Sequence, residues 1–519
     1  MSMTRRKSMK KRIVSILLVT AMTAGLLAGC GGSEKKNDTA KGTGKNEVSE
    51  VSMMIFEDAE APFSEDWMVV KTIEEKTGVK LNVQSVPVSD QATKTQVVFN
   101  SGEMPDIMTK TFPKAADALS GLLLPISDYV DKLPNFQKYL KDNELEKYIE
   151  SQRMADGKYY MLPVKAKTKV IQDHQWLVRK DILDKNNLPM PTTLDELLEV
   201  ALKLKEIYPE STPISNRFKS DNIMAGLAGA FDSIAGWTLG DGMFYDEKED
   251  KWVFSPTTDK WKQFMEYANE LYSSGALDPE FSTQDSSVYE QRIAKGEIFI
   301  VYDWATNCKK FNQEGTPFDE NFNMVAMAPP EGLKDEYALQ WNGPWEQAWV
   351  MPATVAEKDN FDDILKMIDW LYSDEAMTAM TFGEEGVTYK VEDGKKLFMD
   401  DTVKYNSDYG LYENNFCVRL DTDYYASTLP QEVLDVYDVC AENGYVPPTN
   451  PASPLTPEQM DELSVTSSTL VDYVKSMMES FIFGTESLDN WENFVKECEN
   501  KGSTKMEEMY NEAWAARGK

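Results

Sequence analysis

Residues 51–87, VSMMIFEDAEAPFSEDWMVVKTIEEKTGVKLNVQSVP, place a helix pattern between two strand patterns. VSMMIF (51–56) is an apolar run, and VKLNVQSVP (79–87) alternates apolar and polar residues, so both predict strands. Between them, EDWMVVKTIEEKTG (65–78) has helical spacing and ends at Gly78. PDIMT (105–109) predicts one more short buried strand. This order indicates βαβ units around a mainly parallel sheet, an α/β fold.

The same alternation continues along the chain. TLDELLEVALKLKEIY (193–208) predicts a helix whose N-terminus carries a capping box of Thr193 and Glu196. About 470 residues would follow a leader, more than one core comfortably holds, so we expect two domains. Further segments with clear patterns are the strand and helix of 175–188, the helix of 259–275, the strand of 297–304, the strand QAWVMPATV (347–355) and the helix of 360–377.

The N-terminus predicts a secretory leader. RRKSMKKR (5–12) is strongly basic, and the apolar run IVSILLVTAMTAGLL (13–27) that follows is too short to span a bilayer comfortably. Leu27-Ala28-Gly29-Cys30 resembles the lipobox of bacterial lipoproteins, which implies a signal peptide at 1–29 and a diacylated Cys30. An ordinary cleavage site beside a chance cysteine is the alternative. Residues 30–47 lack hydrophobic periodicity, so we expect a flexible tether before a folded region at 48–519.

Composition limits the partners. With 54 basic and 87 acidic residues the net charge is −33, which repels nucleic acid, and we expect no nucleic-acid partner. Four cysteines follow Cys30, at 308, 417, 440 and 498, without C-x-x-C spacing. A disulfide between Cys417 and Cys440, the nearest pair, and isolated buried thiols both remain open.

Several short motifs occur in an order typical of one family: SGEMPDIM (101–108), LLLPISDYV (122–130), DGKYYMLP (156–163), WLVRKDILDKNNLPMPTTLDEL (176–197), LYSSGALDPEF (271–281), GEEGVTYK (383–390) and FGTESLDNWENFVKECENKG (483–502). In this order they resemble extracellular solute-binding proteins of family 1, in the long lipoprotein branch that serves carbohydrate ABC importers. The resemblance implies a two-lobed, periplasmic-binding-protein-like (type II) α/β fold that closes on a sugar in a cleft between the lobes. It also implies a membrane permease and its ATPase as partners, and we expect a monomer that touches the membrane only through its lipid.

Enzyme chemistry finds little support in the residues. His174 is the only histidine, no G-x-S-x-G or phosphate-binding loop occurs, and we interpret His174 as a structural residue rather than a cleft residue. Two alternatives stay open: a peptide-binding lipoprotein and a lipid-anchored glycoside hydrolase with paired carboxylates. PESTPISNRF (209–218) lacks the alternating oxygen ligands of the calcium loop found in many long family members, so we expect no calcium there, and no cofactor.

The chemistry of a sugar indicates which residue types should line its binding site. Pyranose C–H faces pack on aromatic rings, and hydroxyls need short polar groups beside those rings. Asp303 and Trp304 end a predicted strand, where ligands of open α/β sheets bind, although Asp303 could cap the next helix instead. The other candidates are Trp176, which could be core, Trp237 after a Gly-rich turn, and Trp341.

The stretch GPWEQAWV (343–350) completes the candidate site. Pro344 fixes φ and lacks an N–H, so we expect Trp345 on a loop as a ligand-binding ring, with Glu346 beside it as a hydroxyl partner. Trp349 lies inside the apolar alternation that follows, so we expect it in the core.

Overall fold

A computed structural model of the chain describes residues 49–57, 61–166, 174–339, 345–400, 404–413, 415–419, 421–427, 429–445 and 450–517. The predicted leader, Cys30 and the tether lie outside these residues. The chain from Val48 to Lys519 forms one compact unit. Within it we distinguish two lobes with separate sheets and cores: a first lobe of 49–166 and 345–419, and a second lobe of 174–339, 429–445 and 455–517.

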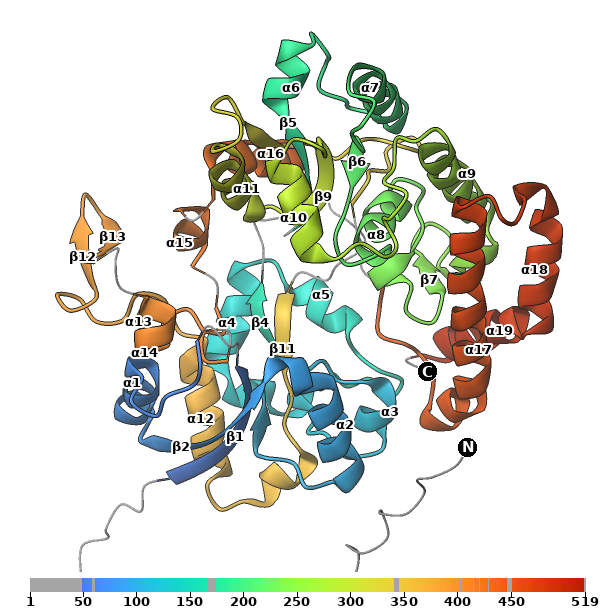
Figure 1. Ribbon diagram of the computed structural model, residues 1–519. Helices are drawn as coiled ribbons and strands as arrows, with labels where there is room; N and C mark the ends of the chain where they lie inside the picture. Colours follow the sequence, from blue (N-terminus) through green and yellow to red (C-terminus); the bar gives the residue numbers. More distant parts are fainter. Residues whose placement is uncertain are drawn as a thin grey trace, which may run out of the picture. The chain divides into compact units, whose positions relative to one another are not determined.

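The first lobe is built on the three-stranded sheet predicted from residues 51–109 (Figure 1). Strand β1 (Ser49–Glu57) lies between β2 (Val79–Pro87) and β3 (Ile107–Met108), and both pairings are parallel. Helix α1 (Met68–Thr77) makes the crossover and ends at Gly78, which has a left-handed φ of 73°. The predicted βαβ unit is therefore confirmed.

Helices and two smaller strand pairs complete the first lobe. Strand β4 (Leu162–Ala166) pairs antiparallel with β11 (Trp345–Trp349), and β12 (Tyr389–Glu392) forms a hairpin with β13 (Lys395–Phe398). The helices are α2 (Gln91–Ser101), α3 (Ala115–Leu119), α4 (Pro134–Asp142), α5 (Glu146–Ser151), α12 (Phe361–Leu371), α13 (Asp374–Phe382) and α14 (Tyr405–Tyr409). Their apolar faces bury residues such as Ile55, Phe136, Trp349 and Ile368 in one core.

The second lobe contains a mixed sheet of order β10-β5-β9-β6. Its strands are β5 (His174–Arg179), β6 (Ile214–Ser215), β9 (Ile300–Trp304) and β10 (Met324–Met327). β6 and β9 are parallel, whereas β5 runs antiparallel to both β9 and β10. The expectation of a mainly parallel sheet is thus wrong for this lobe, because β5 enters it from the first lobe and no βαβ crossover sets its direction.

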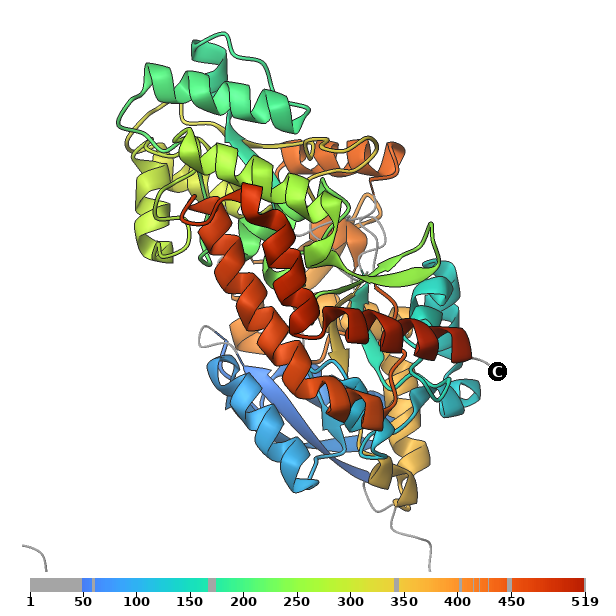
Figure 2. The ribbon, with the colours of Figure 1, turned by 90° about the vertical axis from the view of Figure 1, so that its right-hand side faces the viewer.

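Helices pack around this sheet, and the large C-terminal helix α17 (Pro457–Ile482) packs on α9 (Asp259–Ser273), as Figures 1 and 2 show. The other elements are α6 (Lys180–Lys185), α7 (Leu194–Ile207), α8 (Asp221–Gly229), the 3-10 turn η3 (Gly236–Thr238), β7 (Met243–Asp246), β8 (Lys251–Phe254), α10 (Ser286–Ala294), α11 (Asn307–Gly315), α16 (Gln431–Glu442), α18 (Trp491–Asn500) and α19 (Ser503–Ala516). Helix α15 (Thr422–Ser427) precedes α16. None of the described helices has the length and apolar character that a bilayer crossing needs.

The N-terminus of α7 shows how the sequence fixes local structure. The Thr193 hydroxyl accepts the Glu196 N–H at 3.2 Å, as the capping box predicts. The Glu196 carboxylate, however, accepts from the N–H and hydroxyl of Thr192 at 2.8 and 2.7 Å rather than from Thr193. These hydrogen bonds lower the pKa of the Glu196 carboxyl, because they favour its charged form.

Candidate binding site at the ends of β5 and β9

The register of β5 and β9 brings four aromatic side chains to one face of the second sheet. His174 lies opposite Trp304, and Trp176 lies opposite Tyr302. Side chains alternate along a strand, so these four residues share a face while Asp303 points to the other face. The ring centroids of His174 and Trp304 are 4.1 Å apart, and those of Trp176 and Tyr302 are 5.3 Å apart.

Two further rings extend the outer end of this row into an exposed aromatic surface. Trp237 lies 5.4 Å from His174, and Phe218 lies 5.2 Å from Trp237, centroid to centroid. Relative exposures are 37% for Phe218, 44% for Trp237 and 37% for Trp304, whereas His174 is 2% exposed. We call His174, Phe218, Trp237 and Trp304 the aromatic shelf. Three large rings left open to solvent beside one another are unusual in a folded protein and favour a ligand-binding surface.

Backbone geometry places Trp237 on the shelf. Gly236, just before it, has a left-handed φ of 54°, and a Cβ built there would lie 2.0 Å from the carbonyl oxygen of Asp221. The turn η3 therefore lies directly against the start of α8, an approach that only glycine allows. This contact fixes the backbone of η3, the turn that carries Trp237.

Phe218 is held by a strained loop. Phe218 and Lys219 both have left-handed backbone, with φ of 63° and 57°, although neither is glycine. The Asn216 side-chain amide donates to the carbonyl oxygens of Arg217 and Lys219 and so braces this loop. Strain of this kind costs about 1–3 kcal/mol per residue and persists where the surroundings fix it, often at functional sites. No sequence motif predicted Phe218 at this surface, and its position three residues after the end of β6 was the only available signal.

Trp176 forms the buried base of the aromatic row. It is 0% exposed, and its indole N–H donates to the carbonyl oxygen of Ala338 at 2.9 Å. Gly226 of α8 lies so close that a Cβ there would be 2.7 Å from the Tyr302 ring. The expectation that Trp176 binds ligand is therefore corrected: it is a core residue that supports the shelf.

The expectation that Asp303 binds the ligand is also corrected, because this residue is 0% exposed and its carboxylate is bonded within the protein. Its Oδ1 accepts from the Arg217 guanidinium at 2.7 and 3.1 Å and from the Asn307 amide at 2.9 Å, and its Oδ2 accepts the Tyr289 hydroxyl at 2.8 Å. Burial, followed by the Asp303 charge, raises the pKa of the Tyr289 hydroxyl well above its usual value. Asp303 therefore holds Arg217 in place instead of facing a ligand.

The segment around Trp345 differs most from expectation. Trp345 begins strand β11, pairs with Ala166 of β4 and is 7% exposed in the first-lobe core. The loop predicted from Pro344 is wrong, and Trp345 has no open ring face to offer a sugar. Trp349 is fully buried, as predicted. Glu346 is half-buried on the same strand, and Trp341 lies outside the described residues.

The four cysteines in the described part of the chain, at 308, 417, 440 and 498, are free and buried. Burial raises the pKa of the Cys308, Cys440 and Cys498 thiols to about 12 and raises that of Cys417 as well. Cys417 packs in the first-lobe core and Cys440 in a second-lobe core, so the disulfide alternative is not realised. No cluster of three or more metal-ligating side chains occurs among the described residues.

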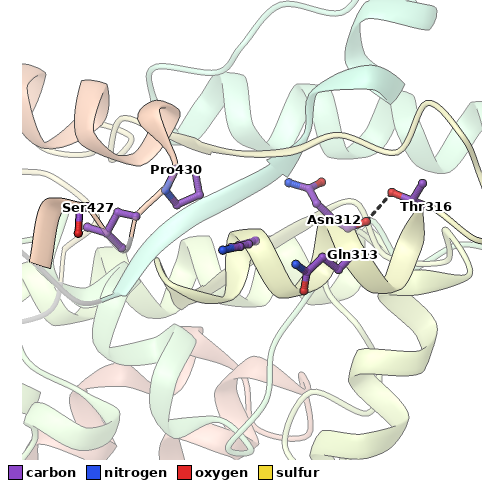
Figure 3. Close-up of a pocket in the computed structure, with 7 residues that line it drawn as sticks. Asn312, Gln313, Thr316, Ser427 and Pro430 are labelled. Carbon is purple, nitrogen blue, oxygen red and sulfur yellow. Dashed lines mark hydrogen bonds between the residues drawn. The ribbon is translucent and has the colours of Figure 1, made fainter. Parts of the chain in front are cut away.

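A cavity of about 460 Å³ lies elsewhere on the second lobe, between α11 and the segment that leads into α16 (Figure 3). Asn312 and Thr316 line one side, and Ser427 and Pro430 the other. Two of its polar side chains are used within the fold: the Asn312 amide bonds both the N–H and the carbonyl oxygen of Met324, and Thr316 donates to the Asn312 carbonyl oxygen. We assign no ligand to this cavity.

Comparison with known proteins adds an independent finding. The family model described as "Bacterial extracellular solute-binding protein" matches residues 56–378, more than half of the chain. The chain is 23% identical over 517 residues to the polygalacturonan/rhamnogalacturonan-binding protein YtcQ of Bacillus subtilis (strain 168), covering 97% of this chain and 99% of that one. It is 26% identical over 542 residues to the fructooligosaccharide ABC transporter substrate-binding protein FusA of Streptococcus pneumoniae serotype 4 (strain ATCC BAA-334 / TIGR4), covering 94% and 95%.

A solved structure shows the same fold. The crystal structure of an extracellular solute-binding protein from Bifidobacterium longum subsp. infantis superimposes with a TM-score of 0.71 at 18% sequence identity, covering 91% of this chain and 99% of that one. At this identity the likeness is one of fold, and it agrees with the two-lobed α/β architecture described above.

Proposed function

The chain belongs to the bacterial extracellular solute-binding protein family, and we propose that it captures a carbohydrate at the aromatic shelf and delivers it to an ABC importer. The observation that carries this proposal is the cluster of three exposed rings, Phe218, Trp237 and Trp304, around His174 at the ends of two strands. Flat aromatic faces suit the C–H faces of a pyranose, and ligands of α/β sheets bind beyond strand ends.

The relatives support the ligand class. YtcQ is named for an acidic polysaccharide and FusA for an uncharged fructooligosaccharide, and both names describe carbohydrate binding. An oligosaccharide fits a shelf with several rings, since successive sugar units can each pack on one. The ligands named for these two relatives differ in charge, so the names do not indicate whether the ligand of this chain is charged.

Delivery requires partners and a place at the membrane. We infer a permease and an ATPase as the importer partners of a monomeric binding protein, with Cys30 carrying a lipid as the sole membrane anchor. A ligand that binds the closed state more tightly than the open state shifts the protein toward closure, which an importer can read as occupancy. We infer no catalytic step and no cofactor.

A ligand screen tests the proposal. Thermal unfolding of the protein should shift upward with at least one oligosaccharide, since a ligand at a hundredfold excess over its Kd stabilises the fold by about 2.7 kcal/mol. Peptides of comparable size should give no shift, and the oligosaccharide should be recovered uncleaved. A shift with peptides alone, or cleavage of the sugar, would contradict the proposal.

The anchor is tested separately. In a bacterial host, the Cys30→Ala variant should appear in the medium or remain as an uncleaved precursor, because lipid burial contributes about 0.8 kcal/mol per methylene and a polar tether contributes none. A processed Cys30→Ala protein that stays on the membrane would contradict lipid anchoring and leave the sugar-binding proposal untouched.

A further inference from the structure

One cation, Arg217, lies next to the Phe218 ring of the shelf. The Arg217 guanidinium lies 5.0 Å from the centre of the Phe218 ring, and its side chain is only 12% exposed. Two of its nitrogens donate to the Asp303 carboxylate at 2.7 and 3.1 Å, and Nη1 donates to Glu290 at 3.3 Å. Asp303 is held by the Tyr289 hydroxyl at 2.8 Å as well. Arg217 is therefore locked in place with its charge directed at carboxylates.

The anions of this network outnumber its cations. Glu290 bonds Lys310 at 2.7 Å in addition to Arg217. Glu314 also pairs with Lys310, at 3.9 Å, so the connected network sets two cations, Arg217 and Lys310, against the carboxylates of Asp303, Glu290 and Glu314. A carboxylate on the ligand would have to displace one of these anions or remain unpaired close to them, and either outcome costs free energy.

The uncharged hydroxyls of a neutral sugar do not incur this free-energy cost. Hydroxyls can accept from guanidinium N–H groups that the carboxylates do not use, and they can donate to the remaining lone pairs of Glu290, which is partly open to solvent. Close to Phe218 in the sequence, exposed Lys219 and half-buried Asp221 carry opposite charges. At longer range, the net charge of −33 repels an anion.

Building on the function proposed above, we propose that the ligand of the aromatic shelf is an uncharged oligosaccharide and that the ion-pair network of Arg217, Asp303, Glu290 and Lys310 discriminates against uronic-acid sugars. Discrimination here means a ratio of affinities between two sugars that differ only at C6, where one has a hydroxymethyl group and the other a carboxylate. The network rejects the carboxylate because its cations already have partners.

The test uses calorimetric titration with pairs of equal length: gluco- and galacto-oligosaccharides against the matching glucuronides and galacturonides. The uncharged member of a binding pair should bind at least roughly tenfold more tightly at about 0.02 M salt. Raising the salt to about 0.3 M should leave its affinity unchanged and should tighten any uronide binding, because repulsion is screened. A uronide that binds more tightly than its uncharged partner, and weakens with salt, would overturn the inference while supporting carbohydrate capture.

Two variants test whether the ion-pair network sets the ratio of affinities between the uronide and the uncharged sugar. Glu290→Gln leaves Arg217 and Lys310 with one carboxylate fewer, so uronide affinity relative to the uncharged sugar should rise roughly 3- to 10-fold. Asp184→Asn is the control, because Asp184 pairs with Lys180 on the surface and has no ion pair with the network, so the ratio should stay unchanged. A Glu290→Gln protein with a native melting temperature and an unchanged ratio would contradict the inference. Absence of binding by every sugar of both kinds would instead overturn the proposed function.

Discussion

Trp304 lies directly opposite His174 in the antiparallel ladder of β5 and β9, with ring centroids 4.1 Å apart. His174 is buried and Trp304 is exposed, so the pair connects the interior of the second lobe to its surface. A rigid aromatic pair fixed by strand register can present a ring face to a ligand with little loss of conformational entropy. The Trp237 ring lies beside this pair, and the Phe218 ring lies beside Trp237.

Trp345 and Trp349 should matter for stability and not for binding. Replacing either with alanine removes a large buried side chain, so each variant should lower the free energy of unfolding by about 3–5 kcal/mol. Denaturant unfolding gives this value, and Trp370→Ala, at a half-buried position on α12, is the control with a smaller loss. A Trp345→Ala protein of native stability that no longer binds sugar would restore the interpretation of Trp345 as a ligand residue.

This contrast shows what the sequence could and could not predict. The unit of β1, α1 and β2 was predictable because strand alternation, helical spacing and the stop at Gly78 are local signals. The exposed position of Trp304 at the end of β9 was predictable because it ends an apolar run. Trp345 was wrongly predicted on a loop because its strand partner, Ala166, is distant in the sequence. Pairing with β4 outweighs the local effect of Pro344.

The prediction for Asp303 was wrong for the same physical reason, a bonding partner that is distant in the sequence. Its position at a strand end fits a ligand residue, but its partner Arg217 is 86 positions away, and no local pattern reveals the pair. Phe218 joins the candidate site only through the structure, since its left-handed backbone follows from packing and not from its residue type.

Asp303→Asn should destabilise the second lobe. The change removes the charge that compensates buried Arg217, and breaking a buried pair from one side costs about 3–5 kcal/mol. Asp184→Asn provides the control, because Asp184 pairs with Lys180 on the surface and such pairs contribute about 0–1 kcal/mol. If Asp303→Asn unfolds like the wild type and only sugar binding is lost, Asp303 acts on the ligand directly.

Gly236 should be a positioning residue for Trp237. Gly236 and Gly240 both have φ of 54°, but a Cβ at Gly240 meets nothing within 4 Å, whereas at Gly236 it meets the Asp221 carbonyl oxygen at 2.0 Å. Gly240→Ala should cost only the left-handed strain, about 1–2 kcal/mol, and bind sugar normally. Gly236→Ala should cost more stability and weaken binding, because η3 and Trp237 must move. Equal affinities for the two variants would show that Trp237 does not depend on this contact.

The buried thiols should be inert in the folded protein. With pKa values raised to about 12, Cys308, Cys440 and Cys498 stay protonated at pH 8, where alkylation needs the thiolate. Iodoacetamide labelling followed by peptide mass spectrometry should find these thiols and Cys417 modified only after unfolding. Because the folded pKa is raised, the thiols should reduce stability only as the pH rises above their ordinary value of 9.0 toward 12. Labelling of the native protein, or a Cys417–Cys440 disulfide, would contradict this.

The central claim is that the aromatic shelf binds the ligand, and calorimetric titration of shelf variants with an oligosaccharide that stabilises the wild type tests it most directly. Trp237→Ala and Trp304→Ala should each weaken binding by about 1–3 kcal/mol, as loss of an exposed stacking ring predicts, with little change in the free energy of unfolding. Trp370→Ala, in the first lobe, should bind normally. Native affinity in both shelf variants would contradict the account and place the carbohydrate site elsewhere on the protein.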